Sequence, residues 1–245
     1  MQVIENLKVK EKLYIDKLEN GLTVMIIPKK GIEKKYIIWG TNYGSNDSKF
    51  IVPGETETIE VPKGVAHFLE HKLFEQENGT NSLDTLTALG VNANAYTTND
   101  HTAYLFECSN KFYEGLDELM DYVQHPYFTD ENVEKEKGII AQEIKMYDDD
   151  PGWRMYINAM DCMYKNNPVK LDIAGTVESI SKITPDVLYK CYNTFYNPSN
   201  MTMVVCGDFV PENLLEEIKK RLIEIFGDKL SIFRNQFFVD ISSKG

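Results

Sequence analysis

The order in which hydrophobic patterns change along the chain is the feature that most constrains its fold. Alternating or short apolar runs predict strands at residues 13–15, 22–27, 36–39, 91–97, 102–108 and 201–206. Apolar residues at helical spacing predict helices at residues 64–73, 112–124, 129–148, 153–164, 185–195 and 211–226, with a short helix beginning near residue 82. Strands followed by helices, and then by one more strand and helix, indicate an α+β fold in which a mostly antiparallel sheet is layered with helices.

Local signals predict where the turns and helix ends lie. Asn20-Gly21 stands between two apolar runs, a pairing typical of a β-hairpin. Residues 42–63 are rich in polar residues, glycine and proline, so we expect a loop there. Side chains suited to helix N-caps are those of Ser82, Thr129 and Thr184. Pro211 is suited to the first turn of a helix.

Composition excludes several classes of protein. The net charge of −12 argues against nucleic acid or an anionic membrane as a partner, since either would favour a basic surface. The apolar stretches are far shorter than the roughly 20 residues that cross a bilayer, and residues 1–10 lack the apolar block of a secretory signal. The 4 cysteines occur singly, which suits free thiols in a reducing compartment. We therefore expect a cytoplasmic location.

The segment His67-Phe68-Leu69-Glu70-His71 carries the clearest chemical signal. On a helix, residues four apart lie on one face, so the two imidazoles can reach one zinc ion while Glu70 projects beside them. H-x-x-E-H is a known signature of zinc peptidases, in which the glutamate serves as the general base. The alternative is a pair of surface histidines, but Phe68 and Leu69 predict a helix that faces inward.

A catalytic zinc site needs a third protein ligand, and the helix predicted at 129–148 offers one. Val133, Glu136, Ile140, Glu143 and Tyr147 follow one another at helical spacing, which places two carboxylates on an apolar stripe. Buried carboxylates need a partner, and a metal ion is one such partner. Pairing of Glu143 with a lysine, or a place at the edge of the stripe, remains the alternative.

Several motifs occur in the order found in one enzyme family. Besides the histidine motif and Glu143, they are Asn94-Ala95-Tyr96-Thr97 with Thr102 and Tyr104, the run from Glu134 to Glu143, and Phe195-Tyr196-Asn197-Pro198 leading to Gly207-Asp208. Together they cover about residues 15–225, and they resemble the pitrilysin and insulinase family, which includes the mitochondrial processing peptidase. The resemblance implies the α+β metallopeptidase domain of the mitochondrial processing peptidase type.

The resemblance also implies a role for each matching residue. One Zn²⁺ per chain would be bound by His67, His71 and Glu143. Glu70 would be the catalytic base, and Glu136 would be a second carboxylate that supports the site. The strand edge that an extended peptide substrate joins would include Asn94, Ala95 and Thr97. Backbone pairing at such an edge binds peptides with little regard to their side chains.

The activity implied is that of a zinc-dependent endopeptidase. We expect residues 1–230 to form its zinc-binding N-terminal domain and residues 231–245 to begin a connector. Family members carry a second similar domain that closes over the substrate, so a second homologous domain, a partner subunit or a dimer is the expected partner. The alternative is a catalytically weak half-enzyme that binds peptides or a partner.

A lyase of bacterial quorum signalling shares the H-x-x-E-H motif on a related fold, with a cysteine as the third ligand. Cys108 is the only cysteine in the strand region between the two motif helices, and no pattern around it supports that role. His101 and His125 lie in polar surroundings, where a lone histidine is usually solvated or locally hydrogen-bonded.

Overall fold

The structure, a computed structural model, describes residues 1–226, with the side chains of residues 1–222. Seven strands form one sheet, in the order β1 (Gln2–Asn6), β2 (Glu11–Lys17), β3 (Thr23–Pro28), β9 (Met201–Gly207), β4 (Lys35–Thr41), β8 (Thr102–Cys108) and β7 (Asn92–Thr97). All neighbouring pairs are antiparallel except β3 with β9, which is parallel. The prediction of a mostly antiparallel sheet is therefore confirmed. The connector expected at 231–245 lies outside the described residues.

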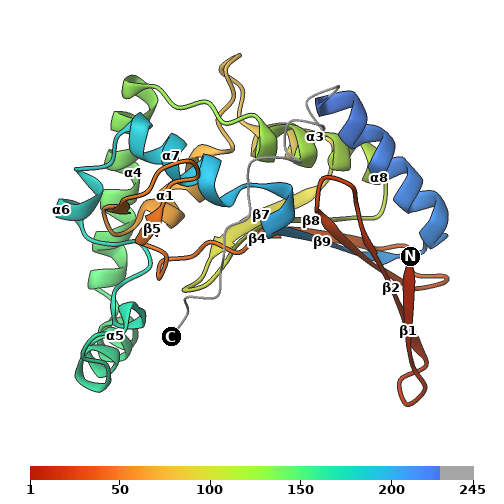
Figure 1. The fold of residues 1–245 in the computed structure, drawn as a ribbon, viewed down its shortest axis with the longest axis horizontal. Helices are drawn as coiled ribbons and strands as arrows, with labels where there is room; N and C mark the ends of the chain where they lie inside the picture. The colour runs from red at the N-terminus through yellow and green to blue at the C-terminus, as the bar shows by residue number, and fades with distance from the viewer. Residues whose placement is uncertain (227–245) are drawn as a thin grey trace.

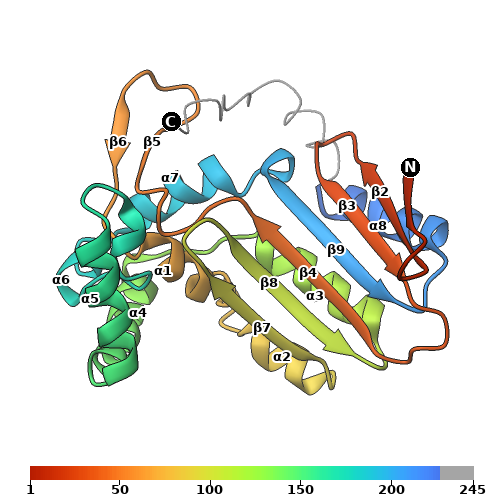
Figure 2. The same ribbon diagram turned by 90° about the horizontal axis from the view of Figure 1, so that it is seen from below.

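Alternating side chains along the central strands explain the layering. Buried and half-exposed residues alternate along β4 and β9, as expected where one face of a sheet packs against helices. That face is covered by α2 (Ser82–Ala88), α3 (Phe112–Gln124) and α8 (Pro211–Phe226), as Figures 1 and 2 show. No helix of the described chain is both long and apolar enough to cross a bilayer.

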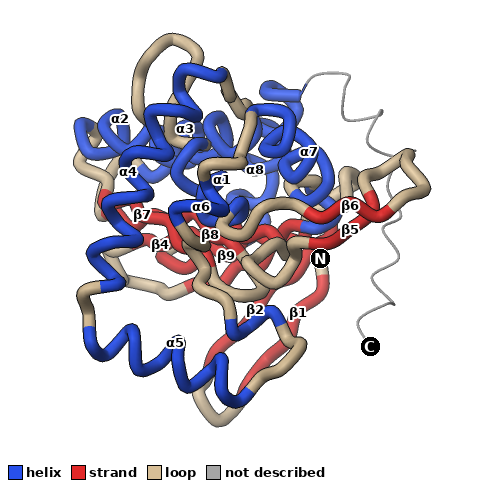
Figure 3. The backbone as a smooth tube through the Cα atoms, turned by 90° about the vertical axis from the view of Figure 1, so that its left-hand side faces the viewer, coloured by secondary structure: helices blue, strands red, loops and turns tan. Residues whose placement is uncertain are grey.

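A second group of helices gathers at one end of the sheet (Figures 1 and 2). It consists of α1 (Val65–Lys72), α4 (Asp130–Asp148), α5 (Pro151–Met163), α6 (Val177–Ile180) and α7 (Pro185–Phe195), with 3-10 turns at Pro168–Lys170 and Pro198–Asn200. Helix α1 contacts β7, α4 and α7, and its Phe68 and Leu69 are fully buried. Helix α5 crosses below α4 and has no buried residue (Figure 3). The histidine motif therefore lies on a short helix held on several sides.

The beginning of α1 is fixed by a close backbone approach. Gly64 caps the helix with φ +90°, and a Cβ there would lie 2.4 Å from the carbonyl oxygen of Ala174. On the facing turn, a Cβ on Gly175 would lie 2.6 Å from the oxygen of Lys63. Ser179 Oγ donates a hydrogen bond of 2.8 Å to that same oxygen. Two glycines thus let the segments meet with no side chain between them.

Most local predictions are confirmed, and two are wrong. Gly21 has φ +92° in the turn joining β2 and β3, so the predicted hairpin is present. Thr129 and Thr184 cap α4 and α7 through their side chains. The cap of α2 is Asn81, not Ser82, because its side-chain oxygen accepts from the amide of Leu83. The loop expected at 42–63 contains a small hairpin of β5 (Lys49–Ile51) and β6 (Thr58–Glu60).

Candidate metal centre

Two helices far apart in sequence bring three predicted metal ligands together. His67 and His71 stand one turn apart on α1, with ring centroids 4.6 Å apart. Glu143 reaches them from α4: its Oε1 lies 3.6 Å from His67 Nε2, and its Oε2 lies 3.6 Å from His71 Nε2. One ligand atom from each residue falls within 4.8 Å of the others, and this is the only such group among the side chains of residues 1–222.

The chemistry and spacing of these atoms fit zinc. A distance of 3.6 Å is too long for a hydrogen bond, yet two ligands at about 2.1 Å from a tetrahedral zinc ion lie about 3.4 Å apart. Burial, and next the neighbouring His71, lower the pKa of His67 to about 3, so its imidazole is neutral. Neutral imidazole is the form that binds metals. Two imidazoles and one carboxylate make a donor set that catalytic zinc sites use.

Glu136 orients one of the two imidazoles. His71 Nδ1 donates a hydrogen bond of 3.1 Å to Glu136 Oε1, which leaves Nε2 facing Glu143. Burial by itself lowers the pKa of His71, but the hydrogen bond to Glu136 and the nearby carboxylates outweigh it, and the pKa is raised. A carboxylate behind a ligand histidine fixes the ring and its tautomer. The equivalent atom of the other ligand, His67 Nδ1, is buried without a hydrogen-bond partner in the described chain.

A buried lysine beside this site was missed in the sequence. Lys72 is fully buried, and its Nζ pairs with Glu75 and lies 4.0 Å from Glu136 Oε2. Lys72 therefore supplies a positive charge next to the carboxylate that orients His71. Its spacing could have indicated burial, because Lys72 follows Phe68 by four residues and so falls on the inward stripe of the helix. A buried charge at such a position needs a partner.

Glu70 is held beside the ligands by a threonine of β7. Glu70 is 7% exposed, and burial raises the pKa of its carboxyl, although a hydrogen bond from Thr97 opposes the change. Thr97 Oγ1 donates that bond to Glu70 Oε2 over 2.7 Å. The predicted base is thus next to His71 in sequence, partly desolvated and fixed at one oxygen.

The other residues predicted for substrate contact lie on β7, at one edge of the sheet. Asn94 is exposed and Ala95 is half-buried. The amide of Ala95 donates a hydrogen bond of 2.9 Å to Asn94 Oδ1. The half-buried Thr97 instead directs its hydroxyl at Glu70. The structure therefore brings Thr97 to the predicted base.

The remaining cysteine and histidine predictions have simple outcomes. Cys108 is buried at the C-terminal end of β8, the strand that Thr102 begins, and it belongs to no ligand group in the described chain. His101 pairs with Asp100 in the turn after β7, and His125 pairs with Asp121 on α3. Both histidines are locally paired, as expected, and their side chains keep 44% and 50% exposure.

Comparisons with known proteins agree with this geometry. A model of the family described as Insulinase (Peptidase family M16) matches residues 54–177, and one described as Peptidase M16 inactive domain matches residues 182–236. The uncharacterized zinc protease YmfH of Bacillus subtilis is 50% identical over 89% of this chain and 50% of its own length. The probable zinc protease PqqL of Escherichia coli is 27% identical over 89% of this chain and 24% of its own.

Solved structures show the same likeness. The crystal structure of an M16-like peptidase from Alicyclobacillus acidocaldarius has 42% identity and a TM-score of 0.83, over 90% of this chain and 51% of that one. Pitrilysin, at 20% identity and a TM-score of 0.74, shares the fold over 89% of this chain and 24% of its own. The chain spans about half the length of the YmfH and Alicyclobacillus relatives. On these matches, the chain belongs to the insulinase family, peptidase family M16.

Proposed function

We propose that this chain is the zinc-binding part of an endopeptidase that hydrolyses extended peptides. The observation that carries the proposal is the approach of His67 and His71 to the two oxygens of Glu143, with both distances at 3.6 Å. Relatives named as zinc proteases add support. These three side chains would hold the ion, and Glu136 would keep His71 in the orientation that ligation requires.

Proton transfer would fall to Glu70. Zinc, when bound, supplies Lewis-acid activation of a water and of the scissile carbonyl. Glu70 would take the proton of the attacking water and deliver it to the nitrogen of the leaving amine. Its burial suits this task, because a raised pKa lies closer to the operating pH than that of a solvated carboxyl.

The edge strand β7 is the proposed place for the peptide. It pairs only with β8 in the described sheet, so its other edge can accept a strand through backbone hydrogen bonds. The amide of Ala95 is occupied by Asn94 Oδ1, and that side chain would have to rotate when a peptide takes its place. Binding of this kind would depend more on an extended peptide backbone than on particular side chains.

The test is the substitution Glu70→Gln, measured in this chain and in a full-length protein that contains it. We expect the variant to keep one zinc per chain and to lose peptide cleavage by about 100-fold or more, the usual contribution of a general base. Glu134→Gln is the matched control, because Glu134 lies on α4 with an exposed side chain. Retained cleavage by Glu70→Gln would show that the base is misassigned.

A second candidate is a half-enzyme that binds peptides or a partner without cleaving them. It is favoured by one observation, that the chain spans only about half of its relatives. If this candidate is correct, the 245-residue chain should bind zinc and a fluorescent peptide but leave the peptide intact. Robust cleavage by a verified monomer of this chain would rule out that candidate.

A further inference from the structure

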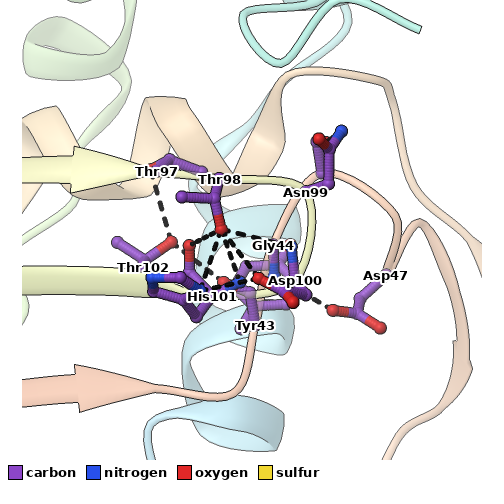
Figure 4. Close-up of polar contacts among 10 residues, drawn as sticks. Tyr43, Gly44, Asp47, Thr97, Thr98, Asn99, Asp100, His101 and Thr102 are labelled. Carbon is purple, nitrogen blue, oxygen red and sulfur yellow. Dashed lines mark hydrogen bonds and ion pairs between the residues drawn. The ribbon is translucent and has the colours of Figure 1, made fainter. Parts of the chain in front are cut away.

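A row of hydroxyl groups leads from Glu70 into the turn between β7 and β8. Thr97 Oγ1 lies 2.7 Å from Glu70 Oε2 and 3.3 Å from Thr102 Oγ1. Thr102 is fully buried, and its hydroxyl donates a hydrogen bond of 2.9 Å to the carbonyl oxygen of Tyr43. Figure 4 shows Thr97 facing Thr102 across the two strands. The row therefore ends on the main chain, at a fixed point of the fold.

Counting the protons gives each hydroxyl a direction. A carboxylate only accepts hydrogen bonds, so the single hydroxyl proton of Thr97 must be donated to Glu70. Thr102 also has one proton, and its shorter contact is the one to Tyr43. The bond from Thr97 to Glu70 is thus charge-assisted and short. With both protons donated elsewhere, the 3.3 Å approach of the two threonine oxygens is a close contact and not a full hydrogen bond.

We propose that Thr97 is a positioning residue that anchors Oε2 of Glu70 and leaves Oε1 as the oxygen that receives the proton. The proposal rests on the base role of Glu70 given above. Among the side chains described, those of residues 1–222, none makes a hydrogen bond to Glu70 Oε1. One oxygen of the carboxylate is therefore held, and the other is free to meet the attacking water.

The anchor itself is rigid. Thr97 and Thr102 face each other in the last pair of the β7–β8 ladder, and a β-branched side chain has few rotamers in a strand. The turn that follows is tied down by Thr98, whose hydroxyl accepts from the amide of His101 at 3.1 Å. Its single proton is shared between Asp100 Oδ1, at 2.9 Å, and the carbonyl oxygen of His101, at 3.0 Å. Figure 4 shows this second group of contacts apart from the one that Thr97 makes. Neighbouring threonines thus serve different ends: Thr98 holds the turn, and Thr97 holds the base.

The experiment compares Thr97→Val, Thr97→Ser and Thr98→Val in the zinc-loaded full-length protein. Thr97→Val keeps the shape but removes the hydroxyl, so we expect kcat to fall about 10- to 100-fold with KM unchanged. Thr97→Ser keeps the hydroxyl and should restore most of kcat. Thr98→Val should lower thermal stability while kcat stays near that of the parent protein. Zinc content, and the visible spectrum of the cobalt-substituted protein, should be the same in all three.

Crystal structures give a readout that does not depend on activity. In Thr97→Val the carboxylate of Glu70 should leave its present position or occupy several, whereas Thr97→Ser should keep it in place. An unmoved Glu70 in Thr97→Val would overturn the proposal, and so would a raised KM with unchanged kcat, since that would make Thr97 a substrate contact. If Glu70→Gln remains active, the proposed function fails. If Glu70→Gln is inactive and Thr97→Val is fully active, only the anchoring role fails.

Discussion

Replacing Gly64 by alanine tests how the helix that carries both histidines is held. The new Cβ would lie 2.4 Å from the carbonyl oxygen of Ala174 and 2.9 Å from its carbon, so backbone has to move. The residue also keeps φ +90°, which L side chains avoid. The substitution therefore combines a conformational cost with a steric one, at the residue that caps the start of α1.

The two costs can be separated with Gly54, which has φ +86° and nothing within 4 Å of its Cβ position. A left-handed conformation costs a non-glycine residue about 1–2 kcal/mol, and we expect Gly54→Ala to show that cost alone. Overpacking adds about 1–3 kcal/mol, so Gly64→Ala should lose about 3 kcal/mol in all. The entropy that alanine removes from the unfolded chain is common to both and cancels in the comparison.

Thermal unfolding of the two variants, side by side, is the assay. At about 2–4 °C per kcal/mol for a chain of this size, Gly64→Ala should lower Tm by about 6–12 °C, clearly more than Gly54→Ala. Zinc affinity should also fall in Gly64→Ala alone, because α1 must shift away from the 174–175 turn. Equal losses of Tm in both variants would refute the reasoning, since the close approach of Gly64 to Ala174 would then add nothing to the cost of the substitution.

Three further substitutions address the site. Glu143→Gln should weaken zinc binding by at least 100-fold in a chelator competition assay, because an amide lacks the charge of a carboxylate ligand, and Glu134→Gln on the same helix should leave it unchanged. Glu136→Gln should weaken zinc binding by about 10- to 100-fold, as loss of the partner of a ligand histidine does; unaltered affinity would show that His71 needs no such support. Lys72→Met should cost about 2–3 kcal/mol in urea unfolding, less than the usual cost of about 3–5 for breaking a buried pair because the side chain of Glu75 keeps 29% exposure. The double substitution Lys72→Met with Glu75→Gln should recover part of that loss, and no recovery would contradict the pairing.

The metal ligands could be predicted because their signal is local on each helix. His67 and His71 share a face by spacing alone, and the stripe of Val133, Glu136, Ile140 and Glu143 follows the same 3.6-residue period. The structure places all four of these α4 residues inward or half-buried. Tyr147, expected on the same stripe, is 38% exposed because α4 has by then passed the core, and its ring packs on Trp153 instead.

The contacts between elements could not be predicted in the same way. The hydrogen bond from Thr97 to Glu70 joins a strand to a helix 27 residues away, and nothing in the spacing of either element signals it. Strand β1 was missed because all five of its residues are exposed, so it lacks the buried alternation that marks a strand. Lys72 was missed because a lysine is almost never fully buried, so its place on the inward stripe was not weighed against the presence of Glu75 three residues later.

The position of β9 has a consequence for how the chain is made. This strand lies between β3 and β4, so without it the sheet separates into β1-β2-β3 and β4-β8-β7. Synthesis of the 99 residues from 109 to 207 takes about 5–20 s at the usual rate, and throughout it the inner edges of β3 and β4 have no partner. Apolar strand edges left open in this way tend to pair with other chains. A nascent or shortened chain that ends before residue 201 should therefore aggregate rather than settle into a smaller domain.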